Sequence, residues 1–413
     1  MTAGLRDNLP ERLPVTAADV RAARELLADV ISVTPVQGSR TLTTRCAGPV
    51  ELKCENLQRA GSFKIRGAYT RIARLTDAER AAGVVAASAG NHAQGVALAA
   101  SLLGASSTVF MPHGAPLPKL VATEAYGATV HFAGTSVDEA IVAAKEFAAE
   151  RGAVLIHPFD HPDVVAGQGT VGLEILEQCP DVRTIVVPTG GGGLLAGIAV
   201  AVGATHPHVR VVGVQAGACA AYPESLAAGH PVTLGATQTM ADGIAVRHPG
   251  DVPFAIIRAL VPDVRTVSEE SLSRALLLCL ERAKMVVEPA GAAAVAALLD
   301  DPQAFEPPVV AVLSGGNIDP LLLLRVLRHG LAASGRYVAF KLRIPDRPGG
   351  LAALLQELAA ADANVLEVEH LRANPRLHVD EVEVYVQIET RGGAHTDLVL
   401  GRLRKAGYQL VFG

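Results

Sequence analysis

The chain has 413 residues, which favours two or three domains of roughly 100 to 200 residues each over a single core. Its net charge of −5 and its aromatic content of 4%, without tryptophan, provide neither the basic footprint nor the stacking platforms typical of nucleic-acid binding, so we expect no such partner. No apolar run approaches the ~20 residues that span a bilayer and the N-terminus lacks a secretory pattern, so we expect no membrane association and a cytoplasmic location.

The first candidate for chemistry is Lys64, in the segment GSFKIRGAY at residues 61–69. The lysine stands at an expected helix start, between Phe63 and Ile65. A lysine with apolar neighbours can have a lowered pKa and act as a nucleophile or form a Schiff base. A solvated surface lysine is the alternative that position alone leaves open.

Short β-branched runs alternate with alanine-rich segments between residues 84 and 314. This pattern predicts an α/β fold of parallel strands joined by crossover helices. The runs are apolar nearly throughout, as expected for strands covered on both faces. The expected strands lie within residues 84–89, 107–112, 129–134, 154–159, 184–189, 209–215 and 309–315. Because open parallel sheets bind ligands at the carboxyl ends of their strands, we expect the site there.

A tight polar turn, SAGNHAQG, follows the first of these strands at residues 88–95. A helix that begins after such a turn presents unbonded backbone N–H groups and the positive end of its dipole to an anion. We therefore predict that the turn can bind a substrate carboxylate. Helix capping by Ser88 and Asn91 is the alternative interpretation.

Four consecutive glycines, Gly190 to Gly193, follow the expected strand at residues 184–189. Such a run loses much backbone entropy on folding, so it needs a reason, such as a close approach of backbone to a ligand. A phosphate held by these amides at the next helix N-terminus supplies that reason. A merely tight turn would need fewer glycines, and we predict a phosphate site.

Two other phosphate-binding loops are excluded or disfavoured at this run. A P-loop requires a lysine followed by Ser or Thr after its last glycine, whereas two leucines follow here. The dinucleotide pattern is formally matched by Gly191, Gly193 and Ala196. However, the next expected strand ends in Gln215, where an acidic residue would bind the ribose, so a nicotinamide-dependent dehydrogenase is the weaker interpretation.

The segment VLSGGNID, residues 312–319, places Ser314 at the end of the last expected strand. Its hydroxyl could face a ring nitrogen of a ligand or simply close a turn with the glycines that follow.

The composition then changes after about Gly335. Residues 335–413 read strand, helix, strand, strand, helix, strand, which predicts a separate ferredoxin-like βαββαβ domain.

Taken in order, the motifs SFKxRG, SAGNHAQG, GGGGL and SGGN closely resemble the fold-type II pyridoxal phosphate enzymes, in their threonine ammonia-lyase (threonine dehydratase) branch, over nearly all of residues 15–330. The resemblance implies a tryptophan-synthase-β-like fold with two open twisted parallel sheets. It implies a large cofactor-binding domain of residues 1–52 and 151–334 and a small domain of residues 53–150. Residues 335–413, with the loop IPDRPGGL, resemble an ACT domain, a regulatory module.

The resemblance also implies roles for the motif residues. Lys64 would hold pyridoxal 5′-phosphate as a Schiff base and act as the base at the substrate Cα. The cofactor would contact Phe63 at its ring face, Asn91 at its ring oxygen, Ser314 at its pyridine nitrogen, and the amides of Gly190, Gly191, Gly192, Gly193 and Leu194 at its phosphate. The substrate carboxylate would meet Ser88, Ala89, Asn91 and His92. We interpret His92 as a structural member of the turn and not as a catalyst.

The implied reaction removes water and ammonia from L-threonine, and also from L-serine, to give 2-oxobutanoate or pyruvate. Related serine racemases carry a second serine in the turn that reprotonates Cα, and Ala89 has no proton to give here. Elimination is therefore favoured, with a serine racemase, another β-hydroxy amino acid lyase and a non-catalytic amino-acid-sensing protein as alternatives. The resemblance further implies a homodimer or homotetramer and an amino-acid effector at the ACT-like domain.

We expect no metal site. The five cysteines have no paired spacing and predict reduced thiols. Gln215 stands where many relatives have an acidic cation ligand. We expect Asp242, in MADGIAV, to cap or bond the backbone, with a remnant cation ligand as the alternative. Glu288, in VVEPAG, either lies near the active site or begins a helix.

Overall fold

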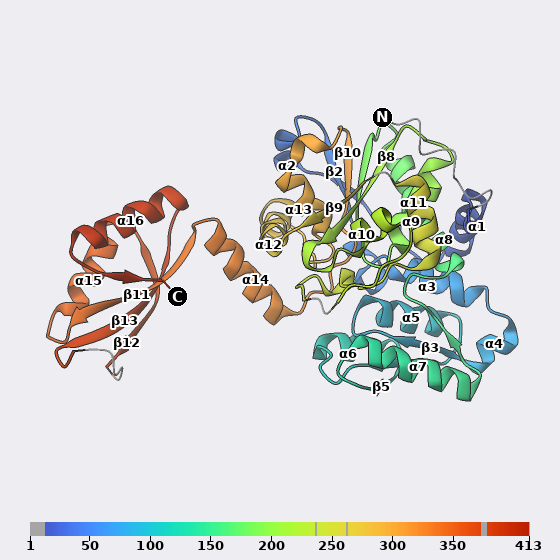
Figure 1. Ribbon diagram of the computed structural model, residues 1–413, viewed down its shortest axis with the longest axis horizontal. Helices are drawn as coiled ribbons and strands as arrows, with labels where there is room; N and C mark the ends of the chain where they lie inside the picture. The colour runs from blue at the N-terminus through green and yellow to red at the C-terminus, as the bar shows by residue number, and fades with distance from the viewer. Residues whose placement is uncertain (1–12, 236–237, 262, 373–377, 413) are drawn as a thin grey trace. The chain divides into compact units, whose positions relative to one another are not determined.

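The computed structural model describes residues 13–235, 238–261, 263–372 and 378–412 (Figure 1). The chain divides into two compact units, Met1–Pro320 and Leu321–Gly413, which we describe separately. Within the described ranges, no helix combines the length and the apolar character that crossing a bilayer requires.

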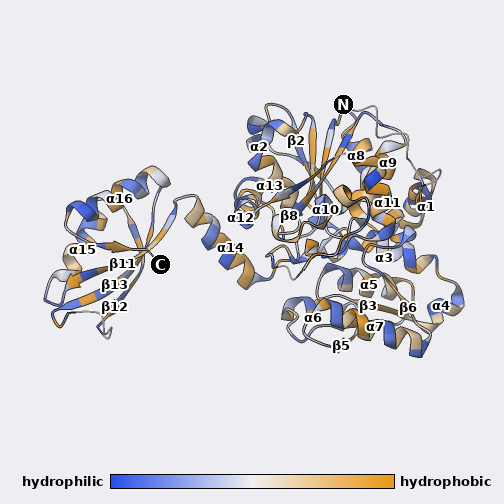
Figure 2. Cartoon of the chain, viewed as in Figure 1, coloured by the Kyte–Doolittle hydropathy of each residue, from blue (hydrophilic) through white to orange (hydrophobic). Residues whose placement is uncertain are grey.

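The first unit contains a six-stranded sheet. Its strands, in spatial order, are β1 (Val36–Gly38), β2 (Val50–Lys53), β10 (Val309–Val312), β7 (Thr184–Pro188), β8 (Arg210–Ala216) and β9 (Asp263–Val267). β1 pairs with β2 in the antiparallel sense, and every other pair is parallel. The central strands are predominantly hydrophobic along their length (Figure 2), as expected for strands that helices cover on both faces.

A second, four-stranded sheet lies in the same unit. Its strands, in spatial order, are β5 (Thr129–Phe132), β4 (Ser107–Met111), β3 (Val84–Ala87) and β6 (Val154–Leu155). All of its pairs are parallel. The α/β expectation of two open parallel sheets with helices is thereby confirmed, and the strands expected from the sequence all lie in these two sheets.

Helices connect the strands of both sheets. The helices of the first unit are α1 (Ala17–Leu27), α2 (Arg40–Arg45), α3 (Lys64–Ala73), α4 (Asp77–Ala82), α5 (Asn91–Leu102), α6 (Leu117–Ala125), α7 (Val137–Arg151), α8 (Pro162–Gln178), α9 (Gly193–Gly203), α10 (Ala221–Ala228), α11 (Asp251–Leu260), α12 (Glu269–Leu278) and α13 (Ala293–Asp300). The core of the large sheet forms where α9 packs against β7 and β8, and α8 and α11 pack against α9. A Cβ at Gly197 of α9 would overlap the carbonyl oxygen of Val165, so glycine permits the close crossing of α8 and α9.

Side chains alternate between the two faces of the small sheet. Val84 and Ala86 of β3 pack against α5, whereas Val85 and Ala87 pack against α7. Both faces are thus covered, which explains why these strands are apolar without alternation. The carboxyl end of β3 leads directly into the SAGNHAQG turn.

A buried ionic cluster fixes α3 to its neighbours. Arg66 of α3 donates from Nε to Glu55 Oε2 at 2.8 Å and from Nη1 to Glu174 Oε1 at 2.6 Å. Lys53 Nζ of β2 lies 2.6 Å from Glu174 Oε2. The two cations and two carboxylates neutralise one another in a region that water does not reach. The start of α3, where Lys64 lies, is therefore anchored to β2 and α8.

The second unit is an antiparallel sheet with two helices. Its elements in chain order are β11 (Tyr337–Pro345), α15 (Gly350–Ala359), β12 (Asn364–Leu371), β13 (Glu381–Glu389), α16 (Gly393–Lys405) and β14 (Leu410–Val411), and α14 (Pro320–Ala333) precedes them. The strand order β12-β13-β11-β14 is that of a ferredoxin-like βαββαβ fold, as predicted. Apolar residues of α15, α16 and the sheet form one core, which includes Phe340, Leu358 and Leu403.

Candidate active site

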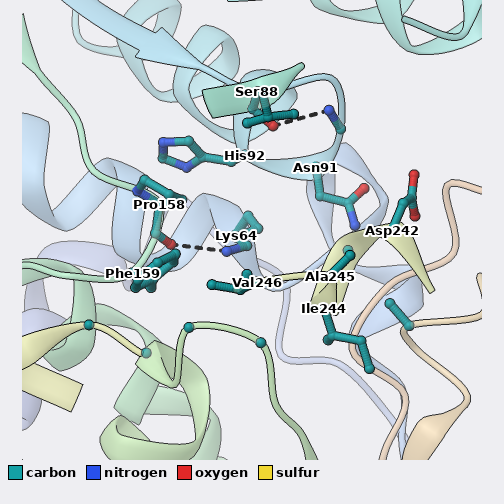
Figure 3. Close-up of a pocket in the computed structure, with 18 of the residues that line it drawn as sticks. Lys64, Ser88, Asn91, His92, Pro158, Phe159, Asp242, Ile244, Ala245 and Val246 are labelled. Atoms are coloured by element: carbon teal, nitrogen blue, oxygen red, sulfur yellow. Dashed lines mark hydrogen bonds between the residues drawn. The ribbon is translucent and has the colours of Figure 1, made fainter. Parts of the chain in front are cut away.

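A cavity of about 640 Å³ lies in the first unit and receives the ends of β3 and β7 and the residue Ser314 after β10 (Figure 3). All four sequence motifs meet in it. The predicted site residues that line it are Phe63, Lys64, Ser88, Ala89, Asn91, His92, Gly190, Gly191, Gly192, Gly193, Leu194 and Ser314. The structure thus brings every predicted site residue to one place.

Lys64 is the first residue of α3, and its amine reaches into the cavity. Nζ donates to the carbonyl oxygen of Pro158 at 2.9 Å and lies 5.2 Å from the centroid of the Phe63 ring (Figure 3). Burial lowers the pKa of Lys64 from 10.5 to about 8, although the nearby Glu288 works in the opposite direction. At this pKa about a tenth of the amine is neutral at pH 7 and about half at pH 8, and the neutral form is the nucleophile.

The SAGNHAQG turn connects β3 to α5. Gly90, and neither Ser88 nor Asn91, is the residue before the first helical turn, and no side chain caps that turn in the described structure. The Ser88 hydroxyl instead accepts from the backbone N–H of Gly90 at 3.1 Å. The capping alternative is therefore wrong, and the first amides of α5 remain available to an anion.

Gly95 explains why the turn and Lys64 share one cavity. A Cβ at Gly95 of α5 would lie 3.1 Å from the carbonyl carbon of Lys64. The absent side chain lets the start of α3 pack directly against α5. The second glycine of SAGNHAQG thus positions the lysine of GSFKIRGAY against the turn.

His92 is buried behind the turn. Its Nε2 lies 2.7 Å from the carbonyl oxygen of Ile156. A carbonyl only accepts, so the ring donates from Nε2. Burial, with a smaller contribution from Lys64, lowers the pKa of His92 to about 3. A neutral ring that bonds the backbone supports a structural role.

The glycine run forms the opposite wall, between β7 and the N-terminus of α9. Gly192 has φ +99°, a conformation that side chains disfavour. A Cβ at Gly191 would overlap the ring of Phe159, and one at Gly192 would overlap the hydroxyl of Tyr222. Only backbone therefore faces the cavity here, and its amides sit at the positive end of a buried helix, as a phosphate requires.

Ser314 closes the cavity beyond β10. The residue is buried, and its carbonyl oxygen accepts from the N–H of Phe63 at 3.2 Å. The bond ties this loop to the residue before Lys64. A neutral hydroxyl at this point can hydrogen-bond a ring nitrogen without transferring a full charge.

Glu288 belongs to the site. It lines the cavity, and its Oε1 accepts from Asn91 Nδ2 at 2.5 Å. The first residue of α13 is Ala293, so a helix-start role for Glu288 is not what the structure shows. Burial, aided by the charge of Asp242, raises the pKa of Glu288 to about 7.

Sequence reasoning was wrong about Asp242 and missed Lys119. The Asp242 carboxylate does not bond the backbone but accepts from Lys119 Nζ at 2.5 Å. Lys119 lies in α6, and both residues line the cavity. No sequence signal separates this buried lysine from a surface lysine, because its partner is 123 residues away.

Gln215 lies outside the cavity lining. Its Oε1 accepts from the backbone N–H of Tyr222 at 2.9 Å. Over the part of the chain that the structure describes, no group of three or more His, Cys, Asp or Glu is placed to hold a metal ion.

A lysine of lowered pKa and a run of backbone amides line one cavity at the ends of parallel strands. With these groups an α/β enzyme can hold an anionic carbonyl compound as its cofactor. Residues 27–315 match the family described as pyridoxal-phosphate dependent enzyme, and the chain belongs to this family. The family resemblance predicted from the four motifs is confirmed, and the cofactor is pyridoxal 5′-phosphate, as predicted.

Two similar sequences match nearly the whole chain. The L-threonine ammonia-lyase of Geobacter sulfurreducens is 46% identical over 397 residues, which cover 96% of this chain and 98% of the relative. The L-threonine ammonia-lyase of Thermotoga maritima is 43% identical over 396 residues, which cover 96% and 99%.

Solved structures with a similar fold cover most of this chain. The threonine deaminase of T.th. has a TM-score of 0.71 and 41% identity, covering 74% of this chain and 99% of that chain. Maize serine racemase has a TM-score of 0.73 and 36% identity, covering 78% and 99%. Structural similarity therefore extends to two different reactions, and site residues must separate them.

Proposed function

We propose that this protein dehydrates and deaminates L-threonine, and also L-serine, to 2-oxobutanoate or pyruvate and ammonia. The observation that carries the proposal is the buried Lys64 amine, whose pKa is lowered to about 8, beside a carboxylate-binding turn whose second residue, Ala89, has no ionisable group. The two L-threonine ammonia-lyases that cover 96% of the chain support it.

The cavity residues fit the cofactor. A Cβ at Gly191 or Gly192 would overlap neighbouring side chains, so this wall presents backbone, and the Lys64 amine lines the same cavity. We propose that Lys64 binds the cofactor covalently, with Phe63 at the ring face, Asn91 at the ring oxygen, Ser314 at the ring nitrogen and the amides of Gly190, Gly191, Gly192, Gly193 and Leu194 at the phosphate. When bound, the cofactor supplies a conjugated system that accepts the negative charge developing at the substrate Cα.

Lys64 is also the group that moves the Cα proton. Its neutral form accepts that proton, and burial keeps the neutral form populated near pH 8. The Pro158 carbonyl, 2.9 Å from Nζ, holds the amine in one direction. Asn91 is in turn oriented by Glu288, which accepts from its amide.

The turn orients the substrate. Ser88, Ala89, Asn91 and His92 surround the place where the carboxylate would meet the amides of α5. His92 holds the turn through its bond to the Ile156 carbonyl. A carboxylate fixed here and a Cα placed at Lys64 direct the β-hydroxyl toward the remaining part of the cavity.

Racemisation is the second candidate, because maize serine racemase has a similar fold. Removal and return of a proton at opposite faces of Cα needs two proton-carrying groups. Position 89 carries a methyl group, which favours elimination. A non-catalytic sensor is disfavoured by the complete set of motif residues around the cavity.

The test is 2-oxo acid formation by the purified, cofactor-loaded protein from L-threonine, L-serine and D-serine. We expect 2-oxobutanoate from L-threonine and little change in the chirality of unreacted serine. Racemised serine with no 2-oxo acid would support the racemase, and absence of both reactions would support the sensor.

We also propose that residues 335–413 are an ACT-like regulatory module that binds an amino-acid effector, in a cytoplasmic homodimer or homotetramer. The βαββαβ order of the second unit supports the assignment of the ACT-like module.

We further propose residues 1–52 with 151–334 as the large catalytic domain and residues 53–150 as the small one. Sedimentation of the protein, and threonine turnover with and without branched-chain amino acids, test the assembly and the effector.

A further inference from the structure

Lys119 is a buried cation that the mechanism above does not use. It lies in the first turn of α6, is 6% exposed and lines the cavity. This position is unfavourable for a cation twice over, because burial removes its hydration and the helix dipole places positive charge nearby. A lysine held there needs acceptors for its N–H groups, and any N–H group without an acceptor is available to a ligand.

Asp242 supplies part of the compensation. Asp242 is the first residue of η4 (Asp242–Ile244), and its Oδ2 accepts from Lys119 Nζ at 2.5 Å. An ammonium group has three N–H donors. Asp242 is its only hydrogen-bond acceptor among the residues that the structure describes, so donors remain for a ligand.

The remaining donors lie next to the carboxylate-binding turn. Lys119 Nζ is 3.7 Å from the position that a Cβ would take on Gly90, the residue before α5. Asp242 and Asn91 of the same turn both line this cavity (Figure 3). The ammonium therefore lies beside the start of α5, where a ligand that meets the first amides of that helix can also reach it.

We propose that Lys119 binds the α-carboxylate of the substrate together with the turn, and that Asp242 is a positioning residue that holds the ammonium there. The inference rests on the proposed function, since it assumes that an amino acid occupies this cavity. An arriving carboxylate would otherwise meet two acidic side chains, Asp242 and Glu288, that line the same cavity. Lys119 offsets that repulsion.

The test compares two ligands that differ only at the carboxyl group. Holoenzyme is titrated with L-alanine and with L-alaninamide, neither of which has a β-leaving group, and binding is followed by the visible absorbance of the cofactor. Lys119→Met should weaken L-alanine binding roughly 10- to 100-fold, the loss expected for a charge-assisted hydrogen bond. Binding of L-alaninamide should change by less than about threefold.

Lys145→Met is the matched control. Lys145 lines the same cavity from α7 but is exposed to solvent. Its loss should alter neither affinity by more than about threefold. Lys119→Arg keeps the charge and should retain most of the preference for L-alanine, which covers the case in which the methionine variant does not fold.

The inference is overturned if Lys119→Met keeps the wild-type preference for L-alanine, or weakens both ligands equally, as a purely structural role would. Loss of the preference in Lys119→Arg as complete as in Lys119→Met would also contradict it. A wild-type holoenzyme that responds to neither ligand, and forms no 2-oxo acid from threonine, would instead overturn the proposed function itself.

Discussion

Two buried cations lie on the same helix, and their surroundings differ. Arg66 of α3 is enclosed by the carboxylates of Glu55 and Glu174. Lys64, at the first position of that helix, donates to a neutral carbonyl, that of Pro158. Compensated burial keeps a cation charged and fixed, whereas burial against a neutral acceptor lowers its pKa. The same helix therefore carries a permanent anchor and a reactive amine.

Removing the reactive amine should have the largest effect on turnover. Lys64→Ala should lower kcat for threonine by at least the order of 10²- to 10⁴-fold that a general base contributes. It should also abolish the visible band of the bound cofactor. The unfolding midpoint should change little, because the amine bonds one carbonyl. Activity near the wild-type level would contradict the role of Lys64.

Removing the anchor should act on stability instead. Arg66→Met leaves Glu174 with Lys53 as its cation and leaves Glu55 with the neutral Thr34 hydroxyl at 2.5 Å, and it should cost about 3–5 kcal/mol of unfolding free energy. Urea unfolding measures this. The control is Arg74→Met, whose partly exposed pair with Asp163 should contribute about 0–1 kcal/mol. Equal losses in the two variants would show that the buried ion pairs of Arg66 stabilise the fold no more than the partly exposed pair of Arg74.

The glycine run, Gly190 to Gly193, allows a similar comparison between two backbone positions. Gly191→Ala places a methyl group against the Phe159 ring and should weaken cofactor binding roughly 10- to 100-fold. Gly203→Ala, in the last turn of the following helix, meets no atom closer than 3.9 Å and should leave cofactor affinity unchanged. Equilibrium titration of the apoprotein with pyridoxal 5′-phosphate checks both. Equal affinities would argue against close backbone contact at Gly191.

The smallest expected effect is on the pH dependence of the rate at which the apoprotein binds the cofactor. Only the neutral amine attacks a carbonyl, so capture by the apoprotein should speed up as pH rises and level off above about 8, the lowered pKa of Lys64. Stopped-flow absorbance measures the rate. Glu288→Gln removes a charge that raises this pKa, and should move the midpoint to lower pH. A rate that keeps rising toward pH 10.5 would show an ordinary lysine.

Local patterns were enough to predict the fold class and the motif residues. The glycine run and the SAGNHAQG turn each follow a strand and precede a helix, so sequence and geometry carry the same information. Strands β1, β2 and β9 were missed. β1 has three residues, and β2 and β9 include charged side chains such as Glu51 and Asp263, so no apolar run marks them.

The remaining parts of the site depend on tertiary contacts. The Lys119–Asp242 pair and the Asn91–Glu288 hydrogen bond join residues 123 and 197 positions apart. Lys119 alone has the sequence context of an ordinary surface residue, and the motif that contains Asn91 does not indicate which carboxylate it contacts. The acceptor for Lys64 is a backbone carbonyl, which every residue has, so no residue type in the sequence indicates it.

The most direct test of the account is to identify the lysine that carries the cofactor. Borohydride reduction of the holoenzyme fixes the lysine–cofactor bond, and peptide mass spectrometry then locates it. We predict the phosphopyridoxyl group on Lys64. Its presence instead on Lys119 or Lys145, which line the same cavity, or on no lysine, would contradict the assignment of the site.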